Sequence, residues 1–254
     1  MNLEEKRVLV TGGAVRIGRA ICEELAGLGA VVVVHYRKSE SEAKALVDLL
    51  RGKGGEAYAV GGELAGAESC RKLIQDAAEV ASGLDLLVNN ASVFHKDVFI
   101  DVAEDKFRNE IEINAFAPMF LSQAFANLER DAGVDLPHGK IINLLDQRVA
   151  GFETGGLPYI LSKKMLSDFT KLAALELAPK FTVNAVAPGP VLPPPGKGDE
   201  YVRELAGAMP LKCRLTPEDV ARAVVYLLEA DAVTGQTIFV DGGQGVGRTL
   251  NDER

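Results

Sequence analysis

Three residues near the middle of the chain have the types and spacing of an acid–base site. Asp146 follows the apolar run 141–145, which predicts a short buried strand. Tyr159 and Lys163 lie four residues apart at the start of a predicted helix, so both side chains project from one face. A free phenol has a pKa of about 10, and a nearby ammonium favours the phenolate. The group predicts proton transfer at the carboxyl end of a strand, although this spacing also occurs at ordinary helix starts.

The elements that position these residues alternate between strands and helices. Buried strands are predicted at 7–10, 30–34, 56–60, 84–88, 141–145, 180–186 and 237–240. Helices are predicted at 19–28, 39–50, 67–81, 102–127, from 159, and at 216–228. This order indicates an α/β fold, a single-domain Rossmann-like doubly wound sheet of seven mainly parallel strands with helices on both faces. The irregular stretch 192–215 is expected to form a substrate lid at about 190–215.

Composition restricts the class of protein. The chain has 254 residues and 47% apolar residues, enough for one hydrophobic core, and no apolar run is long enough to span a membrane. A net charge of −8 and a pI near 5.1 argue against a nucleic-acid surface. The charged N-terminus lacks the pattern of a signal peptide, and the three cysteines are scattered, so we expect a cytoplasmic protein.

A glycine-rich turn follows the first predicted strand. The sequence T-G-G-A-V-R-I-G stands between that strand and a helix, an arrangement that directs backbone N–H groups at a pyrophosphate. Arg16 occupies the position of the middle glycine of the dinucleotide fingerprint, which leaves Gly12 and Gly18 for the turn and the close helix packing. The alternative is a glycine turn without a ligand.

The second predicted strand leads into H-Y-R-K-S. Chains that bind NAD usually carry an acid here for the ribose 2′-hydroxyl, and this chain has none. Arg37, Lys38 and Ser39 follow the strand instead, and together with Arg16 they suit a 2′-phosphate. The sequence therefore predicts NADP(H) as cofactor, against the alternative of a solvated basic turn.

Six separated features then appear in a fixed order: T-G-x(5)-G from Thr11, N-N-A-S from Asn89, Asn114, Tyr159 with Lys163, P-G at Pro188 and D-G-G at Asp241. Together they resemble the short-chain dehydrogenase/reductase family over nearly the whole chain. The resemblance implies that Tyr159 is the general acid/base, that Lys163 lowers its pKa and binds the nicotinamide ribose, and that Asn114 holds a water in the proton relay. It implies no metal.

The same resemblance, with the turn and the basic residues, yields the predicted cofactor site. Glu63 stands where the family usually has an Asp for the adenine amino group, so that contact departs from the pattern. The predicted cofactor-binding residues are Gly12, Arg16, Ile17, Gly18, His35, Tyr36, Arg37, Lys38, Ser39, Glu63, Leu64, Asn90, Ala91, Ser92, Tyr159, Lys163, Pro188, Gly189 and Val191.

Asp146 is the departure that bears on the substrate. Most members of the family carry a Ser thirteen residues before the Tyr, and an acid there resembles the pteridine reductase and dihydromonapterin reductase branch. Phe94 matches an aromatic residue that stacks on the pterin in that branch. The alternatives are a turn acid that replaced a dispensable Ser and an ordinary core aromatic. We expect hydride transfer to a pterin-like C=N or a C=O group, with a proton from Tyr159 or from Asp146, whose pKa a closing, partly dry site would raise. The predicted substrate-binding residues are Phe94, Asp146, Tyr159 and Leu192.

Two alternatives stay open at this point. A 3-oxoacyl-thioester or general carbonyl reductase would keep the fold and change the substrate, and a non-catalytic NADP-binding regulator would keep only the cofactor. In both cases the ligand is a small molecule. The resemblance also implies a homotetramer through the helices that hold Asn114 and Tyr159, where the small residues Ala173 and Ala174 would permit close packing.

Overall fold

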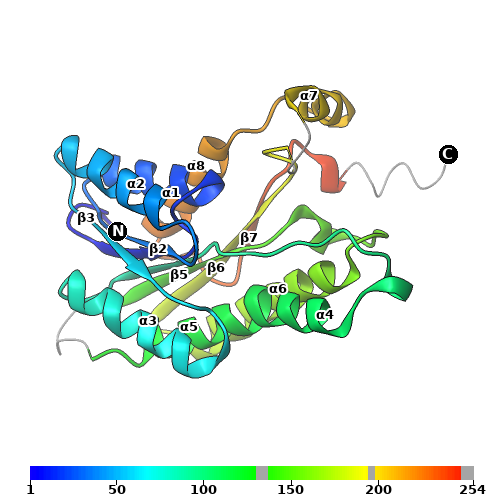
Figure 1. The fold of residues 1–254 in the computed structure, drawn as a ribbon. Helices are drawn as coiled ribbons and strands as arrows, with labels where there is room; N and C mark the ends of the chain where they lie inside the picture. The colour runs from blue at the N-terminus through cyan, green and yellow to red at the C-terminus, as the bar shows by residue number, and fades with distance from the viewer. Residues whose placement is uncertain (130–136, 194–197, 247–254) are drawn as a thin grey trace.

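The computed structural model describes residues 1–129, 137–193 and 198–246, which contain one parallel sheet of seven strands in the order β3-β2-β1-β4-β5-β6-β7 (Figure 1). All its strand pairings are parallel. The predicted fold class is confirmed. The strands are β1 (Arg7–Val10), β2 (Val31–Tyr36), β3 (Ala57–Gly61), β4 (Leu86–Asn89), β5 (Gly139–Leu144), β6 (Phe181–Pro188) and β7 (Thr237–Val240).

Helices cover both faces of the sheet (Figure 1). One layer contains α1 (Arg16–Gly27), α2 (Glu40–Gly52) and α8 (Pro217–Glu229), and the other contains α3 (Gly66–Val80), α4 (Glu104–Ile111), α5 (Ala117–Ala126) and α6 (Leu157–Glu176). Successive side chains of a strand point to opposite faces. Val8 and Val10 therefore belong to one hydrophobic core and Leu9 to the other. Burial on both faces explains why the strands read as continuous apolar runs.

Two predicted segments differ in the structure. The helix predicted at 102–127 is interrupted by a π-helical turn, Glu112–Phe116, which lies between α4 and α5 and contains Asn114. A short 3₁₀ turn, Phe99–Asp101, precedes α4. The stretch 192–215, predicted as irregular, contains α7 (Asp199–Ala208), which lies beyond the carboxyl end of the sheet (Figure 1). That prediction was wrong because a short apolar stripe, with Ala206 and Met209 buried, is enough to dock a helix. Residues 194–197 of the predicted lid lie outside the described part.

Among the described residues, no helix combines the length and apolar character needed to cross a membrane.

His35, near the end of β2, links the loops that follow β1 and β3 at the carboxyl edge of the sheet. The backbone N–H of Gly12 donates to Nδ1 at 3.1 Å, and Nε2 donates to the carbonyl of Gly62, also at 3.1 Å. The ring is only 1% exposed, and burial lowers its pKa to about 4. Both ring nitrogens bond to the protein, so the side chain supports the glycine-rich turn. The assignment of His35 to the cofactor site stays a prediction.

This arrangement predicts a specific pH dependence of stability. The pKa of His35 in the folded protein lies below its ordinary value of 6.5. The neutral ring therefore contributes its full stabilisation of the fold above pH 6.5, and this contribution is lost as the pH falls toward about 4. His35→Asn keeps an acceptor for Gly12 and cannot titrate. We expect it to lower the free energy of unfolding by about 1–3 kcal/mol at neutral pH and to flatten the acid decline. Urea unfolding across this pH range measures both, and parallel curves for the two proteins would contradict the assignment.

Candidate active site

The predicted catalytic residues meet beyond the carboxyl end of β5. Asp146 begins the short turn that follows this strand, and Tyr159 and Lys163 lie in the first two turns of α6. The Tyr159 hydroxyl donates to Oδ2 of Asp146 at 3.2 Å, and Nζ of Lys163 donates to the carbonyl of Leu144 at 2.7 Å. Residues that are thirteen and seventeen positions apart in the sequence thus share one buried site.

Arg148 forms a two-pronged ion pair with Asp146. Its Nε donates to Oδ1 at 2.9 Å and its Nη2 to Oδ2 at 3.0 Å, and the backbone N–H of Arg148 also donates to Oδ1 at 2.9 Å. Burial raises the pKa of Asp146, but the hydrogen bonds and charge of Arg148 outweigh it, so the pKa lies below the ordinary value. The expectation that the site raises this pKa was wrong. The free protein holds Asp146 as a carboxylate, which accepts hydrogen bonds and has no proton to give.

Tyr159 is a protonated phenol in this arrangement. Its ring is 8% exposed, and burial together with the charge of Asp146 raises its pKa above the ordinary value. Lys163 is 3% exposed, and burial lowers its pKa to about 8. Its ammonium lies 5.7 Å from the centre of the Tyr159 ring. The predicted lowering of the phenol pKa by Lys163 is therefore not met in the free protein, because burial and a carboxylate act in the opposite direction.

Phe94 forms a wall of the site. Its ring meets that of Tyr159 edge to face, with centroids 4.9 Å apart, and remains 45% exposed. The Arg148 guanidinium lies 5.3 Å from the centre of the Phe94 ring and 4.9 Å from that of Tyr159. Gly156 makes this possible, because a Cβ there would come within 2.8 Å of the Phe94 ring.

Arg148 is the site residue that the sequence analysis missed. The signal available was a base two positions after Asp146, close enough in the chain to reach its carboxylate.

Asn114 is fully buried within the π-helical turn. Its Oδ1 accepts from the Val93 backbone at 2.8 Å and from the Ser92 hydroxyl at 3.0 Å, and its Nδ2 donates to the Val93 carbonyl at 2.8 Å and to the Ser162 hydroxyl at 3.2 Å. Four partners saturate an amide. The side chain therefore clamps the segment after β4 to α6, and the water relay implied by the family would have to use another group of this turn.

The glycine-rich turn packs closely against the start of α1 and against the loop after β4. Asn90 donates from Nδ2 to the carbonyls of Thr11 and Gly12 at 2.8 and 3.1 Å, and a Cβ on Gly18 would lie 2.2 Å from the Gly12 carbonyl oxygen. Arg16 adopts φ +56°, the left-handed conformation that glycine favours. This backbone conformation explains why the dinucleotide fingerprint has its middle glycine at the position of Arg16. Its guanidinium reaches the carbonyl of Pro193 at 3.5 Å, across the groove from the turn.

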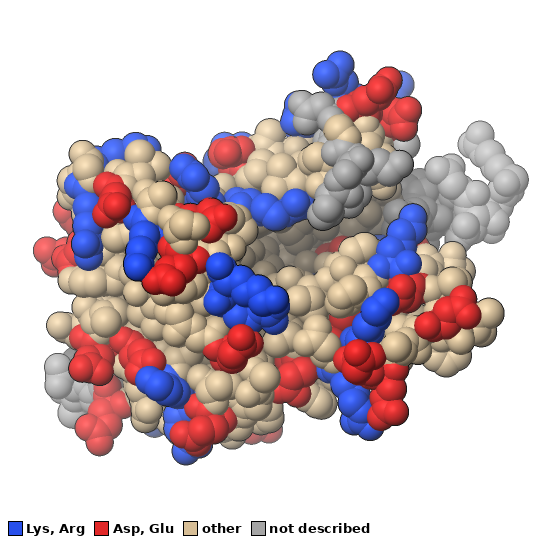
Figure 2. Space-filling view, in the orientation of Figure 1, with Lys and Arg blue, Asp and Glu red and all other residues tan. Residues whose placement is uncertain are grey.

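Three of the predicted phosphate-binding residues, Arg37, Lys38 and Ser39, directly follow β2. Arg37 and Lys38 are exposed after β2, and Figure 2 shows Lys and Arg side chains around the hollow between the two helical layers. Glu63 lies 4.0 Å from Nε of Arg37. Its carboxylate thus balances the charge of Arg37 in the free protein.

Several other predicted cofactor and substrate residues are buried in the core or act through their backbone groups. Tyr36 packs on Gly61, where a Cβ would lie 3.0 Å from the ring, and Leu64 is buried. On the far side, the backbone N–H of Gly189 donates to Val240 at 2.9 Å after the end of β6. Val191 is buried and Leu192 packs against the same core.

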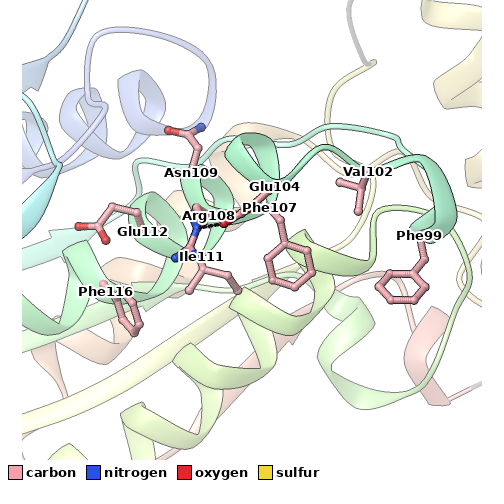
Figure 3. Close-up of a pocket in the computed structure, with 9 residues that line it drawn as sticks. All are labelled: Phe99, Val102, Glu104, Phe107, Arg108, Asn109, Ile111, Glu112 and Phe116. Atoms are coloured by element: carbon pink, nitrogen blue, oxygen red, sulfur yellow. Dashed lines mark hydrogen bonds and ion pairs between the residues drawn. The ribbon is translucent and has the colours of Figure 1, made fainter.

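A separate hollow of about 860 Å³ lies along α4 (Figure 3). Its walls are Phe99, Val102, Glu104, Phe107, Arg108, Asn109, Ile111, Glu112 and Phe116. Arg108 is paired with Glu104 at 2.7 Å. None of the predicted catalytic residues lines this hollow.

The sheet, the glycine-rich turn and the tyrosine–lysine pair define a nucleotide-dependent oxidoreductase. The family profile described as enoyl-(acyl carrier protein) reductase matches residues 13–244. The chain is 32% identical over 245 residues to the 3-oxoacyl-[acyl-carrier-protein] reductase FabG of Staphylococcus aureus, covering 94% of this chain and 97% of the other. It also resembles the crystal structure of FolM alternative dihydrofolate reductase 1 from Brucella canis complexed with NADP, with a TM-score of 0.90, 33% identity and 96% of each chain covered.

The chain therefore belongs to the short-chain dehydrogenase/reductase family and is an NAD(P)-dependent oxidoreductase. The predicted family and the expectation of an enzyme are confirmed.

Proposed function

We propose that the protein is an NADPH-dependent reductase that transfers a hydride to the C=N bond of a flat, pterin-like heterocycle. The observation that carries this proposal is the Asp146 carboxylate, held by Arg148 beside the Tyr159 hydroxyl and the Phe94 ring. A carboxylate accepts hydrogen bonds from the N–H groups of such a ring, and an exposed aromatic face stacks on it. The likeness to the Brucella FolM protein supports the same substrate class.

The residues present fit the cofactor. A turn whose glycines leave no room for a Cβ, with backbone N–H groups at a helix start, suits a pyrophosphate, and Arg16, Arg37 and Lys38 suit a 2′-phosphate. The nicotinamide supplies the hydride when bound. Asp146 orients the substrate through its N–H donors. The Tyr159 phenol, kept protonated by its surroundings, donates the proton to the ring nitrogen, and the nearby Lys163 ammonium favours the phenolate that remains.

A carbonyl reductase acting on 3-oxoacyl thioesters is the second candidate, and the similarity to FabG of Staphylococcus aureus favours it. The site argues against it. A carboxylate facing a carbonyl oxygen cannot donate a hydrogen bond, and the low pKa of Asp146 keeps it deprotonated.

We further propose a single-domain cytoplasmic enzyme that assembles as a homotetramer through α5 and α6. The support is a set of exposed apolar side chains on and near these helices, which an assembly would cover. They are Phe116, Leu161, Met165, Leu172 and Leu175. The three cysteines have no disulfide partner, which fits a reducing compartment.

The cofactor assignment predicts that NADPH is preferred over NADH. Replacing Arg16 and Lys38 together by Ala should weaken NADPH binding by about tenfold to a hundredfold, the size expected for lost charge-assisted contacts, and leave NADH nearly unchanged. Fluorescence titration with each cofactor measures this. Lys72→Ala, an exposed lysine on α3, is the control. An equal loss for both cofactors would contradict the assignment.

The acid assignment predicts that Tyr159→Phe lowers kcat by at least about a hundredfold, since it removes the proton donor, while the dissociation constant of NADPH stays within about twofold. Steady-state rates and cofactor titration measure the two effects. Tyr58→Phe removes an exposed hydroxyl bonded to Glu56 and serves as the matched control. Retention of most of the wild-type rate would remove Tyr159 from the mechanism.

The substrate assignment predicts that Asp146→Ser lowers kcat/KM for dihydropterins by about tenfold to a hundredfold and affects simple ketones or quinones far less. NADPH oxidation, followed by absorbance against dihydropterins, folates, quinones and 3-oxoacyl thioesters, measures it, with Asp48→Ser as an exposed control. Efficient reduction of 3-oxoacyl thioesters without turnover of any dihydropterin or folate would favour the carbonyl reductase instead.

A further inference from the structure

We propose that the Arg148 side chain occupies the place of the substrate, and that a heterocycle with a guanidine-like edge displaces it from Asp146 on binding. This inference rests on the proposed function, because it specifies which edge of the ring the same site recognises. The ligand class is an aminopyrimidinone ring that carries a ring N–H and an exocyclic amino group side by side.

The first argument is the pattern of donors. Arg148 presents two roughly parallel N–H groups, one to each oxygen of Asp146, at 2.9 and 3.0 Å. An aminopyrimidinone presents the same pair of donors from neighbouring atoms of a flat ring. A carboxylate binds both in the same two-pronged geometry. Arg148, the residue that binds Asp146 in the free protein, thus has the hydrogen-bonding pattern of this class of ring.

The second argument is the position of the guanidinium. It is planar and lies about equally far from the ring centres of Phe94 and Tyr159, at 5.3 and 4.9 Å. A substrate that reached both the Tyr159 hydroxyl and the Asp146 carboxylate would have to enter the space beside these two rings. The guanidinium and such a ring would then compete for the same aromatic surroundings and the same carboxylate.

The third argument is that the side chain can leave without disturbing the carboxylate. The Arg148 side chain is 20% exposed and therefore borders solvent. Its backbone N–H donates independently to Oδ1 of Asp146 at 2.9 Å, so this bond remains when the guanidinium moves away. Lys163 also acts on Asp146 and favours its charged form, as Arg148 does. The departing side chain therefore leaves a carboxylate that is still oriented and still faced by a cation.

Displacement makes Arg148 a specificity-determining residue. A ligand binds only to molecules in which the Arg148–Asp146 ion pair is broken. Its apparent dissociation constant is therefore the intrinsic dissociation constant divided by the fraction of molecules in that state. A ring with two adjacent N–H donors restores both hydrogen bonds, whereas a ketone or thioester restores neither. The pair therefore selects against substrates that lack the guanidine-like edge.

Binding to the NADP⁺-loaded enzyme tests the inference without turnover. Isocytosine, the pyrimidine half of a pterin, carries the required edge, and uracil has a carbonyl oxygen in place of the amino group. In Arg148→Met we expect isocytosine to bind about threefold to tenfold more tightly than in wild type, with uracil unchanged. Arg148→Lys, which keeps a charge but not the planar fork, should fall between. Arg71→Met, at an exposed ion pair on α3, is the control.

Competition by methylguanidine gives a second readout. It should displace isocytosine from Arg148→Ala, whose vacated place it fits, and have little effect on wild type at the same concentration. Melting temperatures identify any variant that fails to fold, in which case Arg148→Lys carries the comparison. Weaker isocytosine binding in Arg148→Met would show that the arginine contacts the ligand, and an equal gain for uracil would show mere opening of the site. Absence of isocytosine binding in every variant would equally overturn the inference.

These outcomes are separable from the proposed function. If isocytosine and methylguanidine behave as expected but no dihydropterin or folate is reduced, the ligand edge is right and the reaction is wrong. If dihydropterins are reduced and the Arg148 variants bind isocytosine no better than wild type, the reaction is right and the displacement is wrong.

Discussion

Buried backbone groups in the loops at the carboxyl edge of the sheet need hydrogen-bond partners, and amide side chains supply several of them. Asn90 bonds the turn after β1, and Asn114 bonds the segment after β4. Asn89 donates to Asn143 at 2.9 Å, which donates in turn to Thr170 of α6 at 2.9 Å. The strand ends and α6 are therefore joined by a continuous hydrogen-bonded layer. These hydrogen bonds fix the position of α6, and with it the positions of Tyr159 and Lys163.

The electrostatics of the site follow from one ion pair set within that framework. Burial alone would raise the pKa of Asp146, as it raises that of Tyr159, and would favour the neutral form of both groups. Arg148 reverses the balance for Asp146 only, because its two-pronged hydrogen bonds favour the carboxylate. The charged Asp146 in turn helps to keep Tyr159 protonated. One arginine thereby gives two neighbouring acids different protonation states: Asp146 is a hydrogen-bond acceptor and Tyr159 holds a proton.

Much of this arrangement could be predicted from the sequence, because parallel strands buried on both faces appear as apolar runs and the turns after them carry distinctive residues. All seven strands overlap their predicted ranges, and Asp146, Tyr159 and Lys163 do meet. Arg148 was missed although it lies two positions after Asp146, because closeness in the chain does not by itself say that a basic side chain folds back onto the acid. The pKa directions at Asp146 and Tyr159 failed for the same reason: they depend on distances and burial, and the spacing in the chain specifies neither.

The substrate class cannot be decided from overall similarity, because the identities to a 3-oxoacyl reductase and to a dihydrofolate reductase are 32% and 33%. Both classes need the same sheet and the same cofactor turn, so similarity over the whole chain does not separate them. The distinction must come from the groups that face the reacting atoms. At that place this chain presents an ionised carboxylate and an exposed aromatic ring, an acceptor and a flat surface. Both favour a planar ring that donates hydrogen bonds over an acyl chain whose only polar group there is an acceptor.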